Sequence, residues 1–229
     1  MRKYWLRRNC IFAMMAMFLS ANVHAQVISN STELMSDQRA ISYVFSRPMI
    51  NMLYQHGVVE DRKFGLQQGC QTEYKVRPIG VSILQPIDFP QDKQNPLKGI
   101  WNFRYSLERC GETKVYNSLF FADQNGEVPK AKAYFPGSSN ASPLLIKDAM
   151  VSGMGMAMVN AKQKACKEIV LFDMQVTEEP HTITKDNTSF KNVWSEKWVF
   201  KACGEMVDTY VTFTPDLNGS GTSFSFHAK

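Results

Sequence analysis

The sequence lacks the short motifs by which many enzymes and metal-binding proteins are recognised. Its 229 residues contain no glycine-rich phosphate loop, no H-E-x-x-H zinc motif, no EF-hand loop and no G-x-S-x-G nucleophile motif. Histidine is scarce, with four residues in all. A Ser–His–Asp set would need distant residues that meet around His56, His181 or His227. The sequence therefore predicts no catalytic residues, no cofactor and no metal, and leaves a hydrolase with a dispersed site as an alternative.

Once residues 1–25 are set aside, the chain also has little net charge. These residues hold four of the 26 Lys and Arg residues and none of the 21 Asp and Glu residues, which leaves 22 basic and 21 acidic side chains. The sequence pI of about 8.9 is therefore due mainly to this N-terminal stretch. A nucleic-acid-binding surface needs concentrated positive charge. Because the remainder has no long run of Lys or Arg, we expect no nucleic-acid partner.

Residues 1–25 have the features of a secretory signal peptide that is cleaved before Gln26. A basic segment precedes the short apolar run Cys10–Leu19, and Val23 and Ala25 supply the small residues expected just before a cleavage site. No later segment approaches the roughly 20 apolar residues that a transmembrane helix needs. We expect a periplasmic or secreted protein with no transmembrane segment, and a flexible N-terminus over residues 26–35.

An internal repeat is the main organising feature of the sequence. The segment from Trp101 to Gly126 recurs from Trp194 to Gly219, with every matched position displaced by 93 residues and no gap. The repeat predicts two units of similar structure, over residues 36–137 and 138–229. The matched pairs are Trp101 and Trp194, Cys110 and Cys203, Gly111 and Gly204, Glu112 and Glu205, Asp123 and Asp216, Asn125 and Asn218, and Gly126 and Gly219.

Four cysteines follow residue 25, and an even number in an exported chain is typical of disulfides. Three pairings are possible. Because each repeat contains one pair at a similar separation, the repeat favours Cys70–Cys110 and Cys166–Cys203. A zinc site is the alternative interpretation, but no C-x-x-C spacing and no nearby histidine supports it.

Hydrophobic periodicity predicts an α+β fold in which each unit is a helical element packed on a four-stranded antiparallel sheet with one internal disulfide. In the first unit, one helix begins near Asp37 and a second runs from Ser46 to a stop at Gly57. Extended segments follow over 70–84, 100–109, 113–121 and up to residue 135. A proline-containing connection separates the first two.

In the second unit, Ser142 and Pro143 mark the start of a helix that we expect to end near Lys164. Strands are expected over residues 166–176, from Trp194 onward, and over 206–214 and 222–227. The polar segment 177–192 is interpreted as a connection between the first two of these strands.

Trp194, Glu196 and Trp198 alternate on one face of a predicted strand and are the candidate recognition surface. Aromatic strand faces are usually part of a core, so a carboxylate among them needs an explanation. Either the sheet face is partly open, and the three side chains form a recognition strip, or Glu196 has a buried partner such as a Lys or Arg.

Two further constellations have a functional and a structural interpretation. Met150, Met154 and Met158 recur at helical spacing and, with Met156, offer thioether ligands for Cu(I), but methionines also fill close helix–sheet contacts. Glu112 and Glu205 occupy matching positions after Cys-Gly. Paired carboxylates can act in acid–base catalysis, but in two separate hairpin turns we expect them to be solvated.

The second copy of the repeat resembles a pattern found in small exported proteins of Gram-negative bacteria that have no assigned activity. The pattern is Trp194-x-Glu196-x-Trp198, then Cys203-Gly204, then Pro215-Asp216-x-Asn218-Gly219; in the first copy Phe103 and Tyr105 replace the Glu and the second Trp. The resemblance implies a bacterial source and an exported location. The expected plan is also similar in outline to the tandem beta-lactamase-inhibitor-protein architecture and to cystatin-like folds.

These observations together predict an exported, non-catalytic binding or interaction protein of the bacterial envelope. Its two sheets would present a surface for an unknown protein or small ligand. A secreted hydrolase and a structural component of the envelope are the alternatives.

Overall fold

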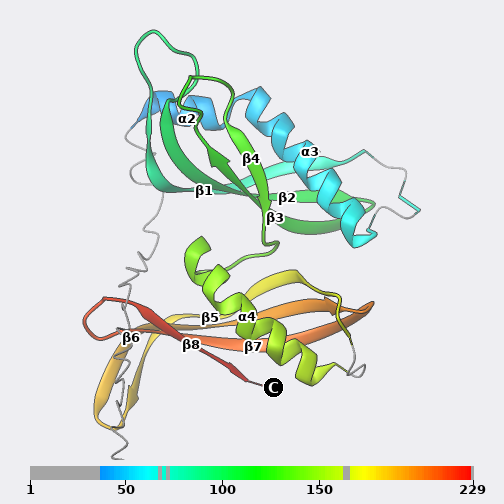
Figure 1. Cartoon of the computed structure of the whole chain (residues 1–229), viewed down its shortest axis with the longest axis vertical. Coiled ribbons are helices and arrows are strands. Elements are labelled where there is room, and N and C mark those ends of the chain that lie inside the picture. The colour runs from blue at the N-terminus through cyan, green and yellow to red at the C-terminus, as the bar shows by residue number, and fades with distance from the viewer. Residues whose placement is uncertain (1–36, 67–68, 71–72, 162–165, 228–229) are drawn as a thin grey trace, which may run out of the picture.

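The chain forms two units, each with a four-stranded antiparallel sheet and a long helix across one of its faces (Figure 1). The structure is a computed structural model and describes residues 37–66, 69–70, 73–161 and 166–227. The predicted signal peptide, residues 1–25, and the segment 26–35 lie outside the described residues. No helix in the described part of the chain is long and apolar enough to cross a membrane.

The first unit begins with two helices. α2 (Gln38–Val44) starts after Asp37, whose carboxylate accepts hydrogen bonds from the backbone N–H groups of Arg39 and Ala40. α3 (Arg47–Phe64) has Pro48 in its first turn, where the missing N–H removes no helical hydrogen bond. Both helices bury apolar side chains against the first sheet: Ala40, Val44, Met49 and Leu53.

The expected stop of α3 at Gly57 is wrong, because the helix continues to Phe64. A Cβ atom on Gly57 would lie 3.1 Å from Leu107 Cδ2 and 3.2 Å from Tyr105 Cε2. This glycine therefore permits the close approach of helix and sheet and does not end the helix. The helix ends at Gly65, whose φ of 73° lies in the left-handed region that favours glycine.

The first sheet has the order β1-β2-β3-β4, and the alternation predicted for its second strand is present. One face of that strand is fully buried under α2 and α3. The other face carries Asn102 and Arg104 toward the segment that joins the two units. The strands are β1 (Lys75–Asp88), β2 (Lys98–Arg109), β3 (Glu112–Phe121) and β4 (Lys130–Tyr134). The buried face of β2 consists of Trp101, Phe103, Tyr105 and Leu107.

The second unit has the helix α4 (Pro143–Asn160) and the strand order β5-β6-β7-β8. The Ser142 side chain caps the helix by accepting a hydrogen bond from Leu145 N at 3.2 Å. The helix ends before the expected position near Lys164, which lies outside the described residues. The strands are β5 (Ile169–Lys185), β6 (Thr188–Ala202), β7 (Glu205–Pro215) and β8 (Thr222–His227).

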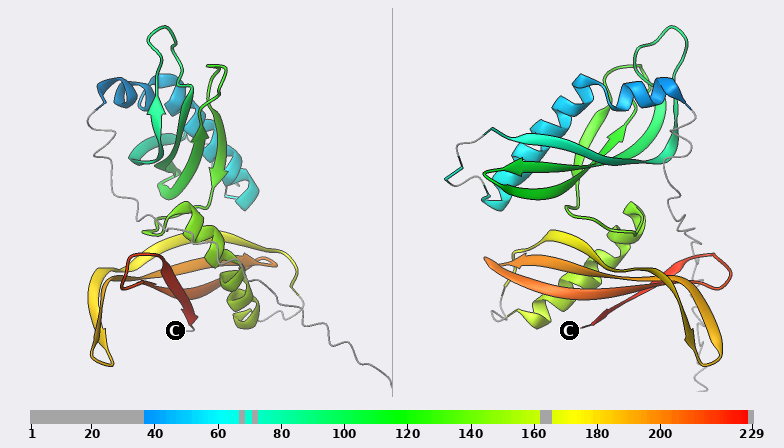
Figure 2. Two further views of the ribbon diagram at one scale, coloured as in Figure 1. Left: turned by 60° about the vertical axis from the view of Figure 1, so that its left-hand side comes forward. Right: turned by 180° about the vertical axis from the view of Figure 1, so that it is seen from behind.

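The polar segment 177–192 is a paired hairpin, so its interpretation as a connection is wrong. β5 and β6 remain paired as far as Lys185 and Thr188. The chain reverses at Asp186 and Asn187, which both have positive φ angles. β7 pairs with β6 only from Trp194 onward. The end of the hairpin therefore extends past the other strands (gold in Figures 1 and 2), and because it has no core to face it shows no apolar alternation.

Both predicted disulfides are confirmed. The Cα atoms are 5.9 Å apart in Cys70–Cys110 and 5.8 Å apart in Cys166–Cys203. In each unit the second cysteine lies in the turn between the second and third strands, with a positive φ angle at Cys110 and at Cys203. Each bridge therefore joins this turn to the chain that leads into the first strand of its own sheet.

A separate hydrophobic core lies between each sheet and the helix or helices that cover it. The first core centres on the buried face of β2 and the second on Trp198, Phe200 and Phe213. Gly153 in α4 allows close packing there, because a Cβ atom on it would lie 3.0 Å from Phe200 Cζ and from Phe226 Cζ. The predicted α+β fold with two four-stranded antiparallel sheets and two disulfides is thus present.

Candidate functional site

Glu196 is a fully buried carboxylate whose two oxygen atoms bind both indole rings of the W-x-E-x-W motif. Trp194 Nε1 donates to Oε1 at 2.8 Å, and Trp198 Nε1 donates to Oε2 at 2.8 Å. The three side chains lie in a row because alternate residues of a strand share a face. These donors compensate in part for the loss of water around the buried carboxylate.

Glu196 also holds the segment that joins the two units, residues 135–142. Its Oε1 atom accepts hydrogen bonds from the Ser139 hydroxyl at 2.8 Å and from the backbone N–H of Asn140 at 2.9 Å. Arg104 of β2 donates from Nη2 to the Ser139 carbonyl at 2.8 Å. Burial lowers the pKa of Arg104, and the negative charge of Glu196 opposes that shift. The motif therefore attaches the joining segment to the second sheet.

Trp194, Glu196 and Trp198 do not form an exposed recognition strip in this structure. Trp194 is 5% exposed, and the other two side chains are completely buried beneath α4 and the joining segment. Of the two alternatives, the structure has the buried carboxylate, but its direct partners are indole, hydroxyl and backbone donors and no Lys or Arg donates to it among the hydrogen bonds of the described residues. Sequence alternation placed these side chains on one face correctly and could not show what covers that face.

The matching positions of the first unit lack this arrangement. Trp101 stacks on Phe120 with ring centroids 5.3 Å apart, as Trp194 stacks on Phe213 at 4.8 Å. Phe103, however, occupies the position that matches Glu196. Trp101 Nε1 is consequently buried with no hydrogen-bond partner in the described part of the chain.

The joining segment is bound to the first sheet as well. Asn117 of β3 donates from Nδ2 to the carbonyls of Phe135 and Gly137, both at 2.8 Å. On the other side, Ser138 N donates to Met174 O of β5 at 2.7 Å. The segment thus lies between the two sheets and fixes their separation.

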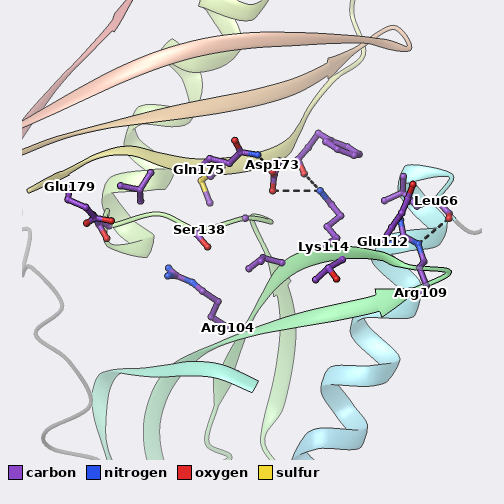
Figure 3. Close-up of a pocket in the computed structure, with 16 residues that line it drawn as sticks. Leu66, Arg104, Arg109, Glu112, Lys114, Ser138, Asp173, Gln175 and Glu179 are labelled. Carbon is purple, nitrogen blue, oxygen red and sulfur yellow. Dashed lines mark hydrogen bonds and ion pairs between the residues drawn. The ribbon is translucent and has the colours of Figure 1, made fainter. Parts of the chain in front are cut away.

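A cleft of about 810 Å³ lies between β2–β3 of the first unit and β5 of the second, and we name it the charged cleft (Figure 3). It is lined by three cations and three carboxylates. Lys114 spans it, donating to the Phe172 carbonyl at 2.7 Å and lying 3.7 Å from Asp173 Oδ1. Burial lowers the pKa of Lys114, and the charge of Asp173 opposes that shift. The ionisable lining residues are Arg104, Arg109, Lys114, Glu112, Asp173 and Glu179.

Arg109 connects the charged cleft to a buried carboxylate behind it. Its Nε atom lies 2.7 Å from Oδ2 of Asp61, which is fully buried, and Tyr116 donates its hydroxyl to Asp61 Oδ1. Burial raises the pKa of Asp61, whereas the Tyr116 hydrogen bond and the Arg109 charge act in the opposite direction. These contacts join α3 to β2 and β3, and we infer that their role is to stabilise the first unit.

A second cleft, of about 870 Å³, lies between the C-terminal end of α3, β4, α4 and β5, and we name it the apolar cleft. Its walls are largely aromatic and aliphatic. Lys201 of β6 crosses toward the first unit and donates to the Phe64 carbonyl at 3.3 Å. Phe64 also packs edge-on against Phe172, with ring centroids 5.1 Å apart. The apolar lining consists of Phe64, Ala133, Tyr134, Phe135, Pro136, Met150, Met154, Ile169, Val170 and Leu171.

The comparisons with known proteins find no match for this chain. No family model matches the chain, and no curated protein or solved structure matches it. The pattern shared with exported Gram-negative proteins, and the outline likeness to the two named folds, therefore stay predictions.

His56 makes the histidine–serine contact that a hydrolase with a dispersed site would need, but the serine is inaccessible. Its Nδ1 atom lies 3.1 Å from the Ser118 hydroxyl, and Glu60 is one helical turn away. Ser118 is 0% exposed and lines neither the charged cleft nor the apolar cleft. His181 instead lies on the protruding hairpin, with Nδ1 2.9 Å from the Glu179 carbonyl oxygen. A substrate carbonyl cannot reach Ser118 Oγ in this arrangement.

The methionines and the paired glutamates are placed as follows. Met150 and Met154 pack against the second core and line the apolar cleft, whereas Met158 is exposed. Glu112 lies 3.6 Å from Arg109, with a largely exposed side chain. Glu205 lies at the matching turn of the second unit. In the described ranges no three His, Cys, Asp or Glu side chains form a group that could hold a metal ion.

Proposed function

We propose that this chain is an exported binding protein whose ligand is a small apolar or amphipathic molecule held in the apolar cleft. The observation that carries the proposal is the cleft itself. Its volume of about 870 Å³ lies within the range typical of small-molecule sites, and such sites are mainly apolar with a few polar groups. It also lies between two structural units, where ligand sites are common.

The lining of the cleft fits such a ligand. Phe64 and Phe135 offer rigid aromatic surface, and Met150 and Met154 offer flexible thioethers that adapt to irregular shapes. Four charged side chains stand among these walls: Glu60, Lys63, Glu168 and Lys201. Because these charges are balanced, the cleft favours a ligand with an apolar body and one polar end over a strongly charged one.

Export and a non-catalytic role complete the proposal. Residues 1–25 support export by their signal-peptide pattern, and the two disulfides are typical of oxidising compartments. We also propose that the two units descend from one duplicated unit, since the matched positions include the cysteine–glycine turns and the stacked Trp–Phe pairs of both sheets. The apolar cleft would then be a product of joining the copies, because both contribute to its walls.

The test is a titration of the disulfide-bonded mature protein with N-phenyl-1-naphthylamine, an uncharged dye that fluoresces in apolar surroundings. We expect saturable binding. Val170→Asp should weaken it at least about tenfold, because Val170 is 45% exposed and lines the cleft, so the change adds a charge to the wall without disturbing a core. Val128→Asp is the matched control, since Val128 is also exposed and lines none of the described cavities. Absence of saturation, or equal affinity in Val170→Asp, would overturn the proposal.

A separate measurement addresses the hydrolase alternative. A fluorophosphonate probe reacts with activated serines, and we expect no labelling of the folded protein because Ser118 is completely buried. Labelling that is lost in Ser118→Ala and in His56→Gln would contradict the non-catalytic role and would identify His56 and Ser118 as a catalytic pair.

A further inference from the structure

One end of the charged cleft holds a cation and a carboxylate that are not paired with each other. Arg104 comes from β2 of the first unit and Glu179 from β5 of the second, and both lie at this end (Figure 3). Neither makes an ion pair with any residue that the structure describes. The other four ionisable lining residues already form pairs: Lys114 with Asp173, and Arg109 with Glu112.

Arg104 has an accessible donor group that its own contacts leave unused. Its Nε atom donates to Asn117 Oδ1 at 3.3 Å, and its Nη2 atom donates to the Ser139 carbonyl at 2.8 Å. Its Nη1 atom has no hydrogen-bond partner among the described residues, yet it is not one of their buried atoms without a partner, so it is open to solvent. The guanidinium group extends toward the joining segment and β5 (Figure 3). Such a group, held in place by two other hydrogen bonds, is suited to bind a carboxylate.

The joining segment adds a hydroxyl group beside Arg104. Ser138 lines the cleft and directly precedes Ser139, whose carbonyl Arg104 binds. The backbone N–H of Ser138 is fixed by its hydrogen bond to Met174 O at 2.7 Å. Its hydroxyl group makes no hydrogen bond within the described part of the chain and is not among the buried atoms there that lack a partner. Arg104 and Ser138 therefore offer donors to the same ligand group.

Glu179 is held close to these donors by the next residues of the joining segment. Asn140 Nδ2 donates to Glu179 Oε2 at 3.4 Å, and only Ser139 separates Asn140 from Ser138. The Ser139 hydroxyl and the Asn140 backbone N–H both bind the buried carboxylate of Glu196. The Trp-x-Glu-x-Trp motif thus fixes the three consecutive residues that connect the donors to the acceptor.

Opposite charges at one place select a ligand that carries both. A carboxylate alone would be attracted by Arg104 and repelled by Glu179, and an amine alone would meet the reverse. An α-amino acid has its ammonium and carboxylate groups on one carbon atom, and its ammonium group donates hydrogen bonds. The adjacent lining includes carbon surface from Val115, Met174 and Val176. The cleft volume of about 810 Å³ also leaves room for a side chain.

We propose that the Arg104–Glu179 end of the charged cleft binds the ammonium and carboxylate groups of a free α-amino acid. The ligand carboxylate accepts hydrogen bonds from Arg104 Nη1 and the Ser138 hydroxyl, and the ligand ammonium donates to the Glu179 carboxylate. The charged cleft and the apolar cleft share no lining residue, so either site can fail its test while the other stands.

The test is a calorimetric titration of the disulfide-bonded mature protein with glycine, L-alanine and L-leucine. We expect saturable binding of at least one of them. The N-acetyl derivative of that amino acid has lost the ammonium charge, and its amide has lost the carboxylate. Each should bind at least about tenfold more weakly, because each loses a charge-assisted contact.

A pair of variants assigns the binding to this end of the cleft. Glu179→Gln should weaken the affinity for the amino acid at least about tenfold while the protein stays folded, because the side chain is exposed. Glu178→Gln is the matched control and should bind as the wild type does. It removes the same charge from the neighbouring residue, but Glu178 does not line the charged cleft and its carboxylate accepts from the Ser195 hydroxyl.

Three results would overturn the proposal. The first is the absence of saturable binding with all three amino acids. The second is an N-acetyl derivative that binds as tightly as its parent, which would show that Arg104 selects any small carboxylate. The third is an affinity that Glu179→Gln leaves unchanged, or that Glu178→Gln lowers equally, which would place the ligand elsewhere on the protein.

Discussion

Gly137 lies directly against the backbone of Met174, across the junction of the two units. A Cβ atom on Gly137 would lie 2.2 Å from Met174 N and 2.4 Å from Met174 O, and its φ of 98° is one that other residues rarely adopt. Neither neighbour is the end of a flexible side chain, so relief requires a shift of the joining segment or of β5. The close approach of the two units at this point therefore requires glycine at position 137.

Gly137→Ala should therefore destabilise the protein far more than a substitution at another glycine with positive φ. We expect a loss of at least about 3 kcal/mol in the free energy of unfolding, measured by urea denaturation. Gly65→Ala is the control, because Gly65 has a φ of 73° but nothing within 4 Å of the added atom. Its loss should be about 1 kcal/mol. Equal losses in the two variants would show that the junction adapts easily.

Removal of the Glu196 carboxylate should disrupt both the second core and the junction. Glu196→Ala leaves the two indole N–H groups, the Ser139 hydroxyl and the Asn140 N–H without their acceptor. We expect a loss of about 3–5 kcal/mol, read from the denaturation midpoint by tryptophan fluorescence. Glu127→Ala, at an exposed position, should change stability by less than about 0.5 kcal/mol. A loss of that small size in Glu196→Ala would contradict the role assigned to the carboxylate.

Sequence patterns predict only part of the arrangement around Glu196. Strand alternation placed Trp194, Glu196 and Trp198 on one face, and the repeat selected both disulfides, because these are local periods and spacings. What covers that face depends on the joining segment, whose hydrogen bonds to two sheets leave no periodic pattern in the sequence. The same limit hid both clefts, which combine side chains from elements far apart in the chain.

Two errors have a more local cause. Gly57 predicts a helix stop because glycine commonly ends helices, whereas in the structure its lack of a side chain allows the contact with Leu107 and Tyr105. The polar composition of residues 177–192 predicts a connection, although a two-stranded ribbon outside a sheet needs no apolar face. In both places the same residue types are compatible with two local structures, and the surrounding tertiary structure determines which one forms.

Loss of the second disulfide should lower stability through the unfolded state. In the chain-entropy model, a bridge that closes a loop of 37 residues contributes about 4 kcal/mol. The Cys166→Ser/Cys203→Ser double variant should therefore unfold at a clearly lower urea concentration than the oxidised wild type. Reduced wild-type protein, which has lost both bridges, should be less stable still. Non-reducing peptide mapping checks the pairing, and a peptide that links the N-terminal half to the C-terminal half would contradict it.

Stability should decrease as the pH falls below neutrality, and His56 should account for part of the decrease. Burial lowers the pKa of His56 from its ordinary value of 6.5, with the charge of Glu60 opposing and that of Lys63 adding to the shift. Between the lowered folded-state pKa and 6.5 the unfolded chain binds more protons than the folded protein. The free energy of unfolding therefore rises with pH through this window, and the stability that His56 contributes is lost as the pH falls through it.

Urea denaturation across a pH series from about 7.5 to about 5 measures this slope, and NMR titration of the imidazole signals should give a midpoint for His56 below 6.5. His56→Gln cannot take up the proton, so its slope across the window should be smaller than that of the wild type. Gln55→Ala, at an exposed position of α3, should keep the full slope. An unchanged slope in His56→Gln would show that His56 does not contribute to the pH dependence. A His56 midpoint above 6.5 would show that the contact with Ser118 favours the charged form of the ring and that burial is not the dominant influence.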